Sequence, residues 1–182
     1  MIHYTDAVKK GAVAEGAPVE SAKTNELIEK LTSRDGIVRE DARRAIVKIG
    51  NPAVRPLLEL LASPNVQLRW EAAKALADIG DPVAAPALVN VLDDEEFAIR
   101  WLAAEGLIMM GTRGLPALLR GLERNADSIW LREAAHHILH DLRRRESLRD
   151  GIQPVLEALE GPEPAHAVPY AARALRERLM GV

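Results

Sequence analysis

The chain has 182 residues, 48% of them hydrophobic and 28% charged, which is enough apolar content to bury the core of one soluble domain. Cysteine is absent, which excludes disulfides, thiolate catalysis and Cys-ligated zinc or iron–sulfur sites. The net charge of −3 and the pI near 6.0 argue against a general nucleic-acid binder. No apolar run approaches the roughly 20 residues of a membrane helix, and no signal core is present, so we expect a cytoplasmic protein.

The first 23 residues differ from the rest of the chain. They lack the pattern that follows and contain Gly11, Gly16 and Pro18, so we interpret residues 1–23 as a loose arm or a partial N-terminal cap. From residue 24 to residue 182 we expect one helical repeat domain. Its first helix is predicted within the segment TNELIEKLTS, residues 24–33.

A short phrase then recurs about every 31 residues, and an arginine near its start serves as a reference position in four copies. These arginines, Arg39, Arg69, Arg100 and Arg132, are 30, 31 and 32 residues apart. Apolar residues stand at offsets −1, 3, 7 and 10 from each arginine, which is the spacing of one helix face. The residue at offset 3 is always alanine, whose small side chain permits close helix packing. We expect the arginines to link adjacent repeats by hydrogen bonds to carboxylates or helix ends.

The ends of these helices also carry recurrent signals. Four residues before each arginine stand polar residues, three of them good N-cap types. After the first three copies comes a glycine, which can adopt the left-handed conformation that ends a helix. The N-cap positions are Asp35, Asn65, Glu96 and Ser128, and the glycines are Gly50, Gly80 and Gly111.

Each glycine is followed by another apolar segment with a proline near its start. Pro56, Pro86 and Pro116 recur 30 residues apart, and a regular helix should begin close to each, since an interior proline costs about 3 kcal/mol. One repeat is therefore helix, turn, helix and glycine. The expected repeats are about 24–50, 51–80, 81–111, 112–146 and 147–180.

The last two repeats depart from the pattern. In the fourth, Arg143 stands where glycine is expected, so its second helix should continue to about Glu146. In the fifth, Pro154 occupies the recurrent proline position of a first helix, and Val168 replaces the arginine of a second helix. Such divergence is typical of a terminal unit whose outer face meets water.

The phrases GDPVAAPAL (80–88) and LRWEAAKAL (68–76) resemble HEAT repeats of the short bacterial kind that is named after phycobilin lyases. The resemblance covers about residues 24–180. It implies an all-α fold, a right-handed α-α solenoid of about five repeats, with the second helices lining the concave surface. Such repeats occur in adaptor proteins, in bilin lyase subunits and in a few enzymes.

On that surface, the positions one, five and eight after each arginine should face a partner. Trp70 and Trp101 occupy equivalent positions in adjacent repeats, about 10 Å apart, and exposed aromatic residues are common binding anchors. The alternative is that both rings lie flat over the alanine-rich helices and cover the core. The residues predicted to bind a partner are Trp70, Trp101, Lys74, Glu105, Ile108, Glu40, Arg44 and His137.

A cluster of histidines follows in the fourth repeat, where His136 and His140 are four apart and Glu133 precedes them. This spacing can bind a metal. Position 136 is alanine in other copies, however, so His136 should face a neighbouring helix, and we expect a structural or solvated cluster with no metal. The sequence contains no glycine-rich phosphate loop, nucleophile elbow or paired carboxylates, so we expect no cofactor and no catalytic residue.

Two functions fit these observations. The first is a non-catalytic adaptor whose concave face holds a peptide or helix of another protein. The second, implied by the resemblance, is a phycobilin lyase-like subunit or chaperone that handles a bilin or other tetrapyrrole. Nucleic acid is not expected as a partner, because Glu40, Glu105 and Glu133 on the same face would repel a phosphate backbone.

Overall fold

The computed structural model describes residues 17–145 and 149–181, which form helices joined by short turns and contain no strand. Short 3-10 turns lie at Asn51–Ala53, Pro82–Ala84, Val91–Asp93 and Gly111–Arg113. The α-helices in chain order are α1 (Ala17–Lys30), α2 (Gly36–Ile49), α3 (Val54–Leu60), α4 (Val66–Ile79), α5 (Ala85–Asn90), α6 (Phe97–Met110), α7 (Leu115–Arg124), α8 (Ile129–Arg145), α9 (Arg149–Glu160) and α10 (Pro164–Met180).

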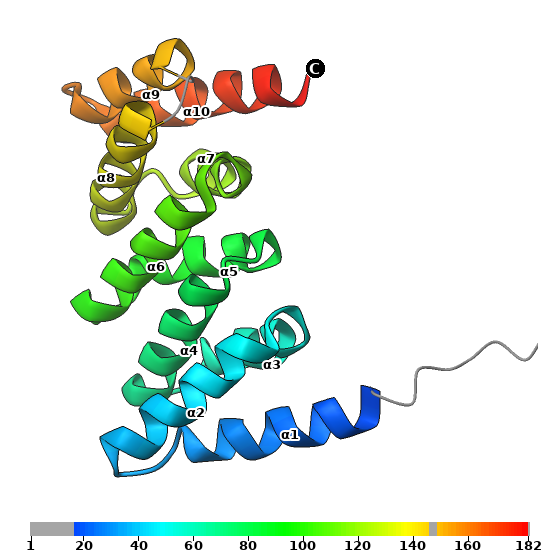
Figure 1. The fold of residues 1–182 in the computed structure, drawn as a ribbon. Coiled ribbons are helices and arrows are strands. Elements are labelled where there is room, and N and C mark those ends of the chain that lie inside the picture. Colours follow the sequence, from blue (N-terminus) through cyan, green and yellow to red (C-terminus); the bar gives the residue numbers. More distant parts are fainter. Residues whose placement is uncertain (1–16, 146–148, 182) are drawn as a thin grey trace, which may run out of the picture.

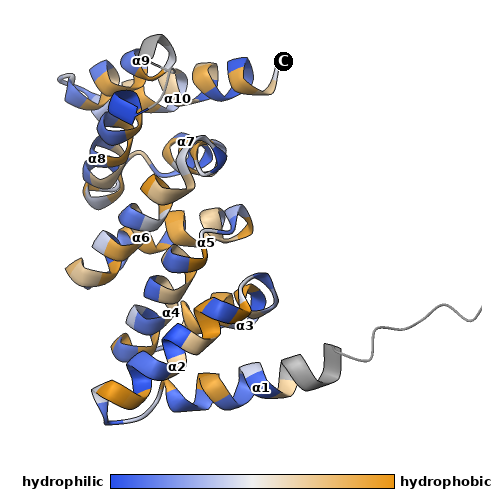
Figure 2. Ribbon diagram, in the orientation of Figure 1, coloured by the Kyte–Doolittle hydropathy of each residue, from blue (hydrophilic) through white to orange (hydrophobic). Residues whose placement is uncertain are grey.

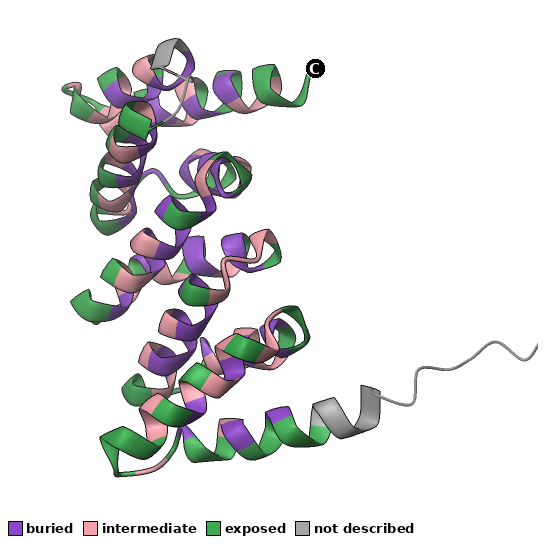
Figure 3. Ribbon diagram, in the orientation of Figure 1, coloured by how far each residue is buried: buried purple, intermediate pink, exposed green. Residues whose placement is uncertain are grey.

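The helices stack as pairs in two layers (Figure 1). The second helices of successive repeats pack on one another, α2 on α4, α4 on α6 and α6 on α8, and the first helix α5 packs on α7. Buried side chains lie between the layers (Figure 3), and they form one continuous core from Leu27 to Leu175. The predicted all-α solenoid is confirmed.

The predicted N-caps are confirmed at three positions. The side chains of Asp35, Asn65 and Ser128 each accept a backbone N–H from the first turn of α2, α4 and α8, at 2.8, 2.9 and 3.1 Å. Glu96 makes no such bond. Asp94 accepts the N–H of Glu96 at 2.9 Å, the same turn contact that Ser33 and Ser63 make with Asp35 and Asn65, so the first turn of α6 has no side-chain cap.

Helices α2, α4 and α6 end at the predicted glycines, Gly50, Gly80 and Gly111, which have φ angles of 74°, 67° and 61°. Only Gly80, with ψ 21°, is in the left-handed helical region, which costs other residues about 1 kcal/mol or more; Gly50 and Gly111 have ψ angles of −136° and −138°. The recurrent prolines lie in the first turns of α3, α5 and α7. Helix α1 begins at Ala17 rather than near residue 24, and residues 1–16 of the expected arm lie outside the described part of the chain.

Two helical glycines allow adjacent repeats to approach closely. A Cβ on Gly106 of α6 would lie 3.1 Å from the Cα of Ala77 in α4. A Cβ on Gly121 of α7 would lie 2.4 Å from Cγ1 of Val89 in α5. In the middle of the stack, adjacent helices therefore approach so closely that no side chain fits at Gly106 or Gly121 without a shift of its neighbours, and both layers depend on these small residues.

The fifth unit differs from the expected order of helices. Its helix α9 packs on α8, a second helix, whereas α10 packs on α7, a first helix, so the two layers are exchanged relative to the preceding repeats. Helix α8 has no glycine stop and extends through Arg145, as predicted. Arg176 of α10 pairs with both carboxylate oxygens of Glu123 in α7, which fixes the exchanged arrangement.

Candidate functional site

The four reference arginines share one interaction. The Nη1 atom of each donates to the carbonyl of the residue six positions earlier, in the turn that precedes its own helix. The acceptors are Ser33 for Arg39 at 2.8 Å, Ser63 for Arg69 at 3.0 Å, Asp94 for Arg100 at 2.7 Å, and Ala126 for Arg132. This shared contact lies within one repeat and closes its turn, so it is not the predicted link between adjacent repeats.

The first two arginines also reach into the next repeat. Arg39 donates from Nε to Glu71 at 3.1 Å, and this carboxylate is only 2% exposed. Arg69 donates from Nε and Nη2 to the two oxygens of Asp94, at 2.8 and 3.1 Å. The hydrogen bond to Asp94 raises the pKa of Arg69 above its ordinary value. The predicted links to carboxylates of adjacent repeats are thus present at these two boundaries.

Arg100 is paired differently. Its guanidinium carbon lies 4.4 Å from the ring centroid of Trp130 in the next repeat and 5.7 Å from that of Phe97. Its hydrogen bonds go to the carbonyls of Asp94 and Glu95. Within residues 17–145 and 149–181, Arg100 has no carboxylate partner. Arg100 therefore contacts the next repeat through an aromatic ring, whereas Arg39 and Arg69 contact it through carboxylates.

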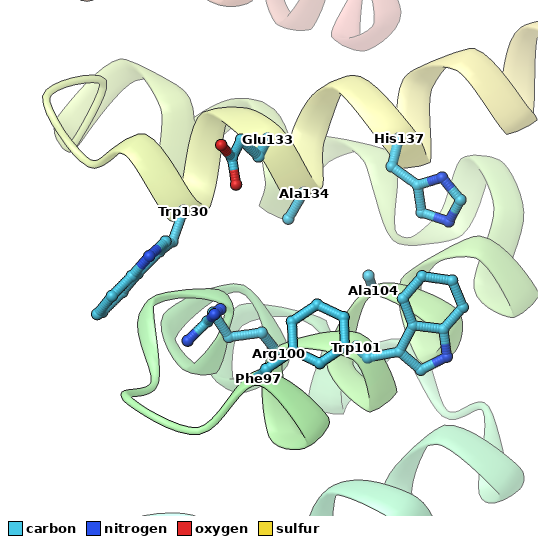
Figure 4. A pocket seen from close by; sticks show the side chains of 8 residues that line it. All are labelled: Phe97, Arg100, Trp101, Ala104, Trp130, Glu133, Ala134 and His137. Carbon is cyan, nitrogen blue, oxygen red and sulfur yellow. The ribbon is translucent and has the colours of Figure 1, made fainter.

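Arg100 forms part of a pocket between α6 and α8, which we call the aromatic pocket (Figure 4). Its volume is about 160 Å³. Figure 4 shows Trp130 and Trp101 at opposite ends, with the Glu133 carboxylate pointing into the space between them. The lining residues are Phe97, Arg100, Trp101 and Ala104 of α6, and Trp130, Glu133, Ala134 and His137 of α8.

The aromatic side chains of the pocket are held in place yet remain open to solvent. Trp101 stacks on His137 with ring centroids 5.4 Å apart, and Phe97 lies 6.3 Å from Trp101. Phe97, Trp101 and Trp130 are 67%, 48% and 42% exposed. His137 also lies 3.8 Å from Glu105. Three of the predicted partner-binding residues, Trp101, Glu105 and His137, are thus brought together.

Trp70 lies in a different place. It belongs to a hollow between α2 and α4, with Glu40 and Arg43, which we call the Trp70 hollow. The Arg43 guanidinium covers one side of the ring at 5.3 Å, and the indole packs against the core. Trp70 therefore resembles the covering residue of our alternative interpretation more than an open anchor. Trp70 and Trp101 do not line one pocket.

The other predicted surface residues form local pairs or are buried. Lys74 pairs with Asp78 at 2.6 Å, and Arg44 pairs with Glu40, both one turn apart on the same helix. Ile108 is only 5% exposed and belongs to the core. Its predicted exposure is wrong, because the position eight residues after the arginine lies in the continuous core, where the second helices pack on one another.

Sequence reasoning missed Phe97 and Trp130, which stand three and two residues before the reference arginines. The first turns of the second helices carry exposed apolar side chains in other copies too, including Ile37 of α2 and Val66 of α4. Figure 2 shows this apolar turn at the outer tip of α2. The signal was therefore present in the sequence, one turn before the positions that we compared.

The histidine cluster is tied to the last unit. His136 is 2.9 Å from Glu160 of α9, so it faces a neighbouring helix, as predicted. Its ring lies 6.1 Å from that of His140. Among the described residues, no group of three or more histidines and carboxylates is arranged to hold a metal ion. In the same part of the chain, no helix is long and apolar enough to cross a membrane.

The model of one protein family matches the chain twice. The model of HEAT repeats matches residues 24–108 and again residues 54–140, which together span more than half of the chain. The chain belongs to the HEAT-repeat family. The second match includes every residue of the aromatic pocket, so the pocket is formed by two successive HEAT repeats.

One solved structure shows the same fold over most of the chain. It is the complex of CpcE and CpcF of phycocyanin lyase from Nostoc sp. PCC7120, with 24% sequence identity and a TM-score of 0.59. The similarity covers 86% of this chain and 99% of that one. A search of curated protein sequences gives no match. At this identity, the similarity establishes the HEAT-repeat fold alone.

Proposed function

We propose that this HEAT-repeat protein is a non-catalytic adaptor that holds a segment of another protein against its second-helix layer. The aromatic pocket between α6 and α8 is the main contact site. The observation that carries the proposal is the grouping of three exposed aromatic rings, on two adjacent repeats, around one small pocket. Large aromatic side chains in such clusters dominate the energetics of many interfaces.

The size of the pocket favours a protein partner. Its volume of about 160 Å³ lies below the roughly 300–1,000 Å³ that is typical of sites for small molecules and cofactors. It suits one or two side chains of a peptide. Of the residues predicted from the sequence, Trp101, Glu105 and His137 stay in the proposed site, Phe97 and Trp130 are added, and Ile108 is removed.

Affinity capture from the native host tests this function. Wild-type protein and the Trp101→Ala/Trp130→Ala variant would serve as baits, with Tyr170→Ala as the matched control, since Tyr170 is an exposed aromatic residue on α10 outside the pocket. We expect one partner to be retained by wild type and by Tyr170→Ala, and to be lost with the double variant. Equal capture by all three folded proteins would contradict the proposed site.

The similarity to the phycocyanin lyase complex supports a second candidate function, in which the chain handles a bilin as a lyase subunit or chaperone. Incubation with a bilin and an apo-phycobiliprotein distinguishes the two. A bilin-handling protein would shift the visible absorbance or transfer the chromophore to the acceptor. An adaptor gives neither change.

A further inference from the structure

The arginine row contains an irregularity that bears on the partner's chemistry. At Arg39 and Arg69, the Nε and Nη2 side of the guanidinium is occupied by carboxylates of the next repeat. At Arg100 and Arg132, the guanidinium hydrogen bonds to other described residues run from Nη1 to carbonyls of the preceding turn. In the described ranges, neither of these two guanidinium groups meets an acid.

Stacking does not satisfy the remaining donors of Arg100. A guanidinium stacks through its flat face but donates hydrogen bonds from its edge, so an arginine over an indole can still bind a carboxylate in a bidentate manner. Trp130 holds Arg100 from one face. The carbonyls of Asp94 and Glu95 fix its Nη1 atom. The unpaired edge of Arg100 is therefore preorganised at the aromatic pocket.

We infer that the partner segment is acidic and apolar, and that one of its carboxylates completes at Arg100 the pairing that Glu71 and Asp94 provide for Arg39 and Arg69. An apolar side chain next to that acid enters the space between Trp101 and Trp130. This inference rests on the proposed function and adds to it the chemical class of the partner.

Arg132 offers a second guanidinium that is unpaired among the described residues and would bind a second carboxylate of the partner. It occupies the equivalent position in the next repeat, and it lines a neighbouring hollow with Ile129 and Leu159. Equivalent positions on packed helices are about 10 Å apart, and an extended peptide rises about 3.3 Å per residue. Because alternate side chains of an extended peptide face the same side, an extended partner carries its two acids four residues apart, about 13 Å, with the apolar residue midway between them on that side.

Glu133 limits how much negative charge the site accepts. Its carboxylate points into the aromatic pocket, has no ion-pair partner among the described residues, and lies on the opposite helix from Arg100. A nucleic acid would place several phosphates close to Glu133 and Glu105, which repel them. A peptide can instead direct a backbone N–H toward Glu133 while its acid meets Arg100.

Selection from a displayed library of random twelve-residue peptides tests the inference without knowledge of the natural partner. We expect the recovered peptides to be enriched in Asp or Glu beside Leu, Phe or Trp. The best peptide would be synthesised with each acid changed in turn to its amide. Replacing the acid that meets Arg100 should weaken binding on the order of tenfold, because a charge-assisted hydrogen bond is lost.

The protein variants separate this inference from the proposed function. Loss of peptide binding in Trp101→Ala, with binding kept in Tyr170→Ala, places the peptide in the aromatic pocket. If such a peptide tolerates amides at every acid, the acidic partner is refuted while the adaptor function stands. If no selected peptide depends on Trp101, or if single-stranded DNA competes with the peptide at low micromolar concentration, both proposals are overturned.

Discussion

Arg69 and Asp94 form two parallel hydrogen bonds across the boundary between the second and third repeats, and both side chains are buried. Asp94 has a further task, since the same carboxylate accepts the N–H of Glu96 in the turn before α6. One residue thus joins two repeats and holds the turn that leads into a helix.

Asp94→Ala should therefore lower the free energy of unfolding by about 3 kcal/mol, the lower end of the cost of leaving a buried charge without its partner. The lower end applies because Arg69 keeps a hydrogen bond to Glu95 at 3.1 Å. Urea unfolding followed by circular dichroism measures the change. The matched control is Glu95→Ala, whose exposed side chain should contribute less than about 1 kcal/mol. Equal effects of the two substitutions would show that the buried pair has no special role.

Gly106→Ala should destabilise the middle of the stack. The new methyl group would lie 3.1 Å from the Cα of Ala77, and backbone yields less readily than a side chain. We expect a loss of about 1–3 kcal/mol from overpacking, reduced by up to about 1 kcal/mol because alanine is the better helix former. Gly36→Ala is the control, since its Cβ would meet nothing closer than the Arg39 side chain at 3.6 Å. A more stable Gly106→Ala protein would refute the close packing of α4 and α6.

Gly80→Ala tests the role of the glycine that ends α4. The residue has φ 67° and ψ 21°, angles that residues with a side chain rarely adopt. A Cβ at this position would meet no close neighbour, so the cost comes from the backbone conformation alone. The expected cost is about 1–2 kcal/mol, measured by the urea midpoint. Gly80→Asn should recover part of that loss, because asparagine tolerates the left-handed region better than alanine. A loss that asparagine does not reduce would point to a cause other than backbone strain.

Trp70→Ala and Trp101→Ala should separate stability from binding. Trp70 packs on the core beneath Arg43, so its removal should lower the unfolding temperature by several degrees. Trp101 is 48% exposed, so its removal should change that temperature little while it abolishes peptide binding. Thermal unfolding and fluorescence titration of the same two proteins provide the comparison. The reverse result, a stable Trp70→Ala protein that no longer binds, would move the site to the Trp70 hollow.

Periodicity was sufficient to predict the repeats, the N-caps and the stop glycines, because each depends on residues close together in one copy. Asp35, Asn65 and Gly80 are examples in which the local signal and the structure agree. Of the residues predicted to bind a partner, Trp101, Glu105 and His137 lie together, and their role in binding stays a prediction.

The remaining features depend on how one copy meets the next. Comparing equal offsets pairs Trp70 with Trp101, whereas the folded stack brings Arg100 to Trp130, which stands two positions before its own reference arginine. Likewise, Pro154 lies inside α9, five residues after its first residue Arg149, rather than in the first turn, and nothing in the local sequence indicates that α9 packs on a second helix.

The Trp70 hollow and the aromatic pocket belong to different pairs of repeats, since the first lies between α2 and α4 and the second between α6 and α8. In a solenoid, each repeat interacts directly only with its neighbours. Substitutions in the two hollows should therefore have additive energies. This independence allows one surface to change its specificity over evolution while the other retains its own.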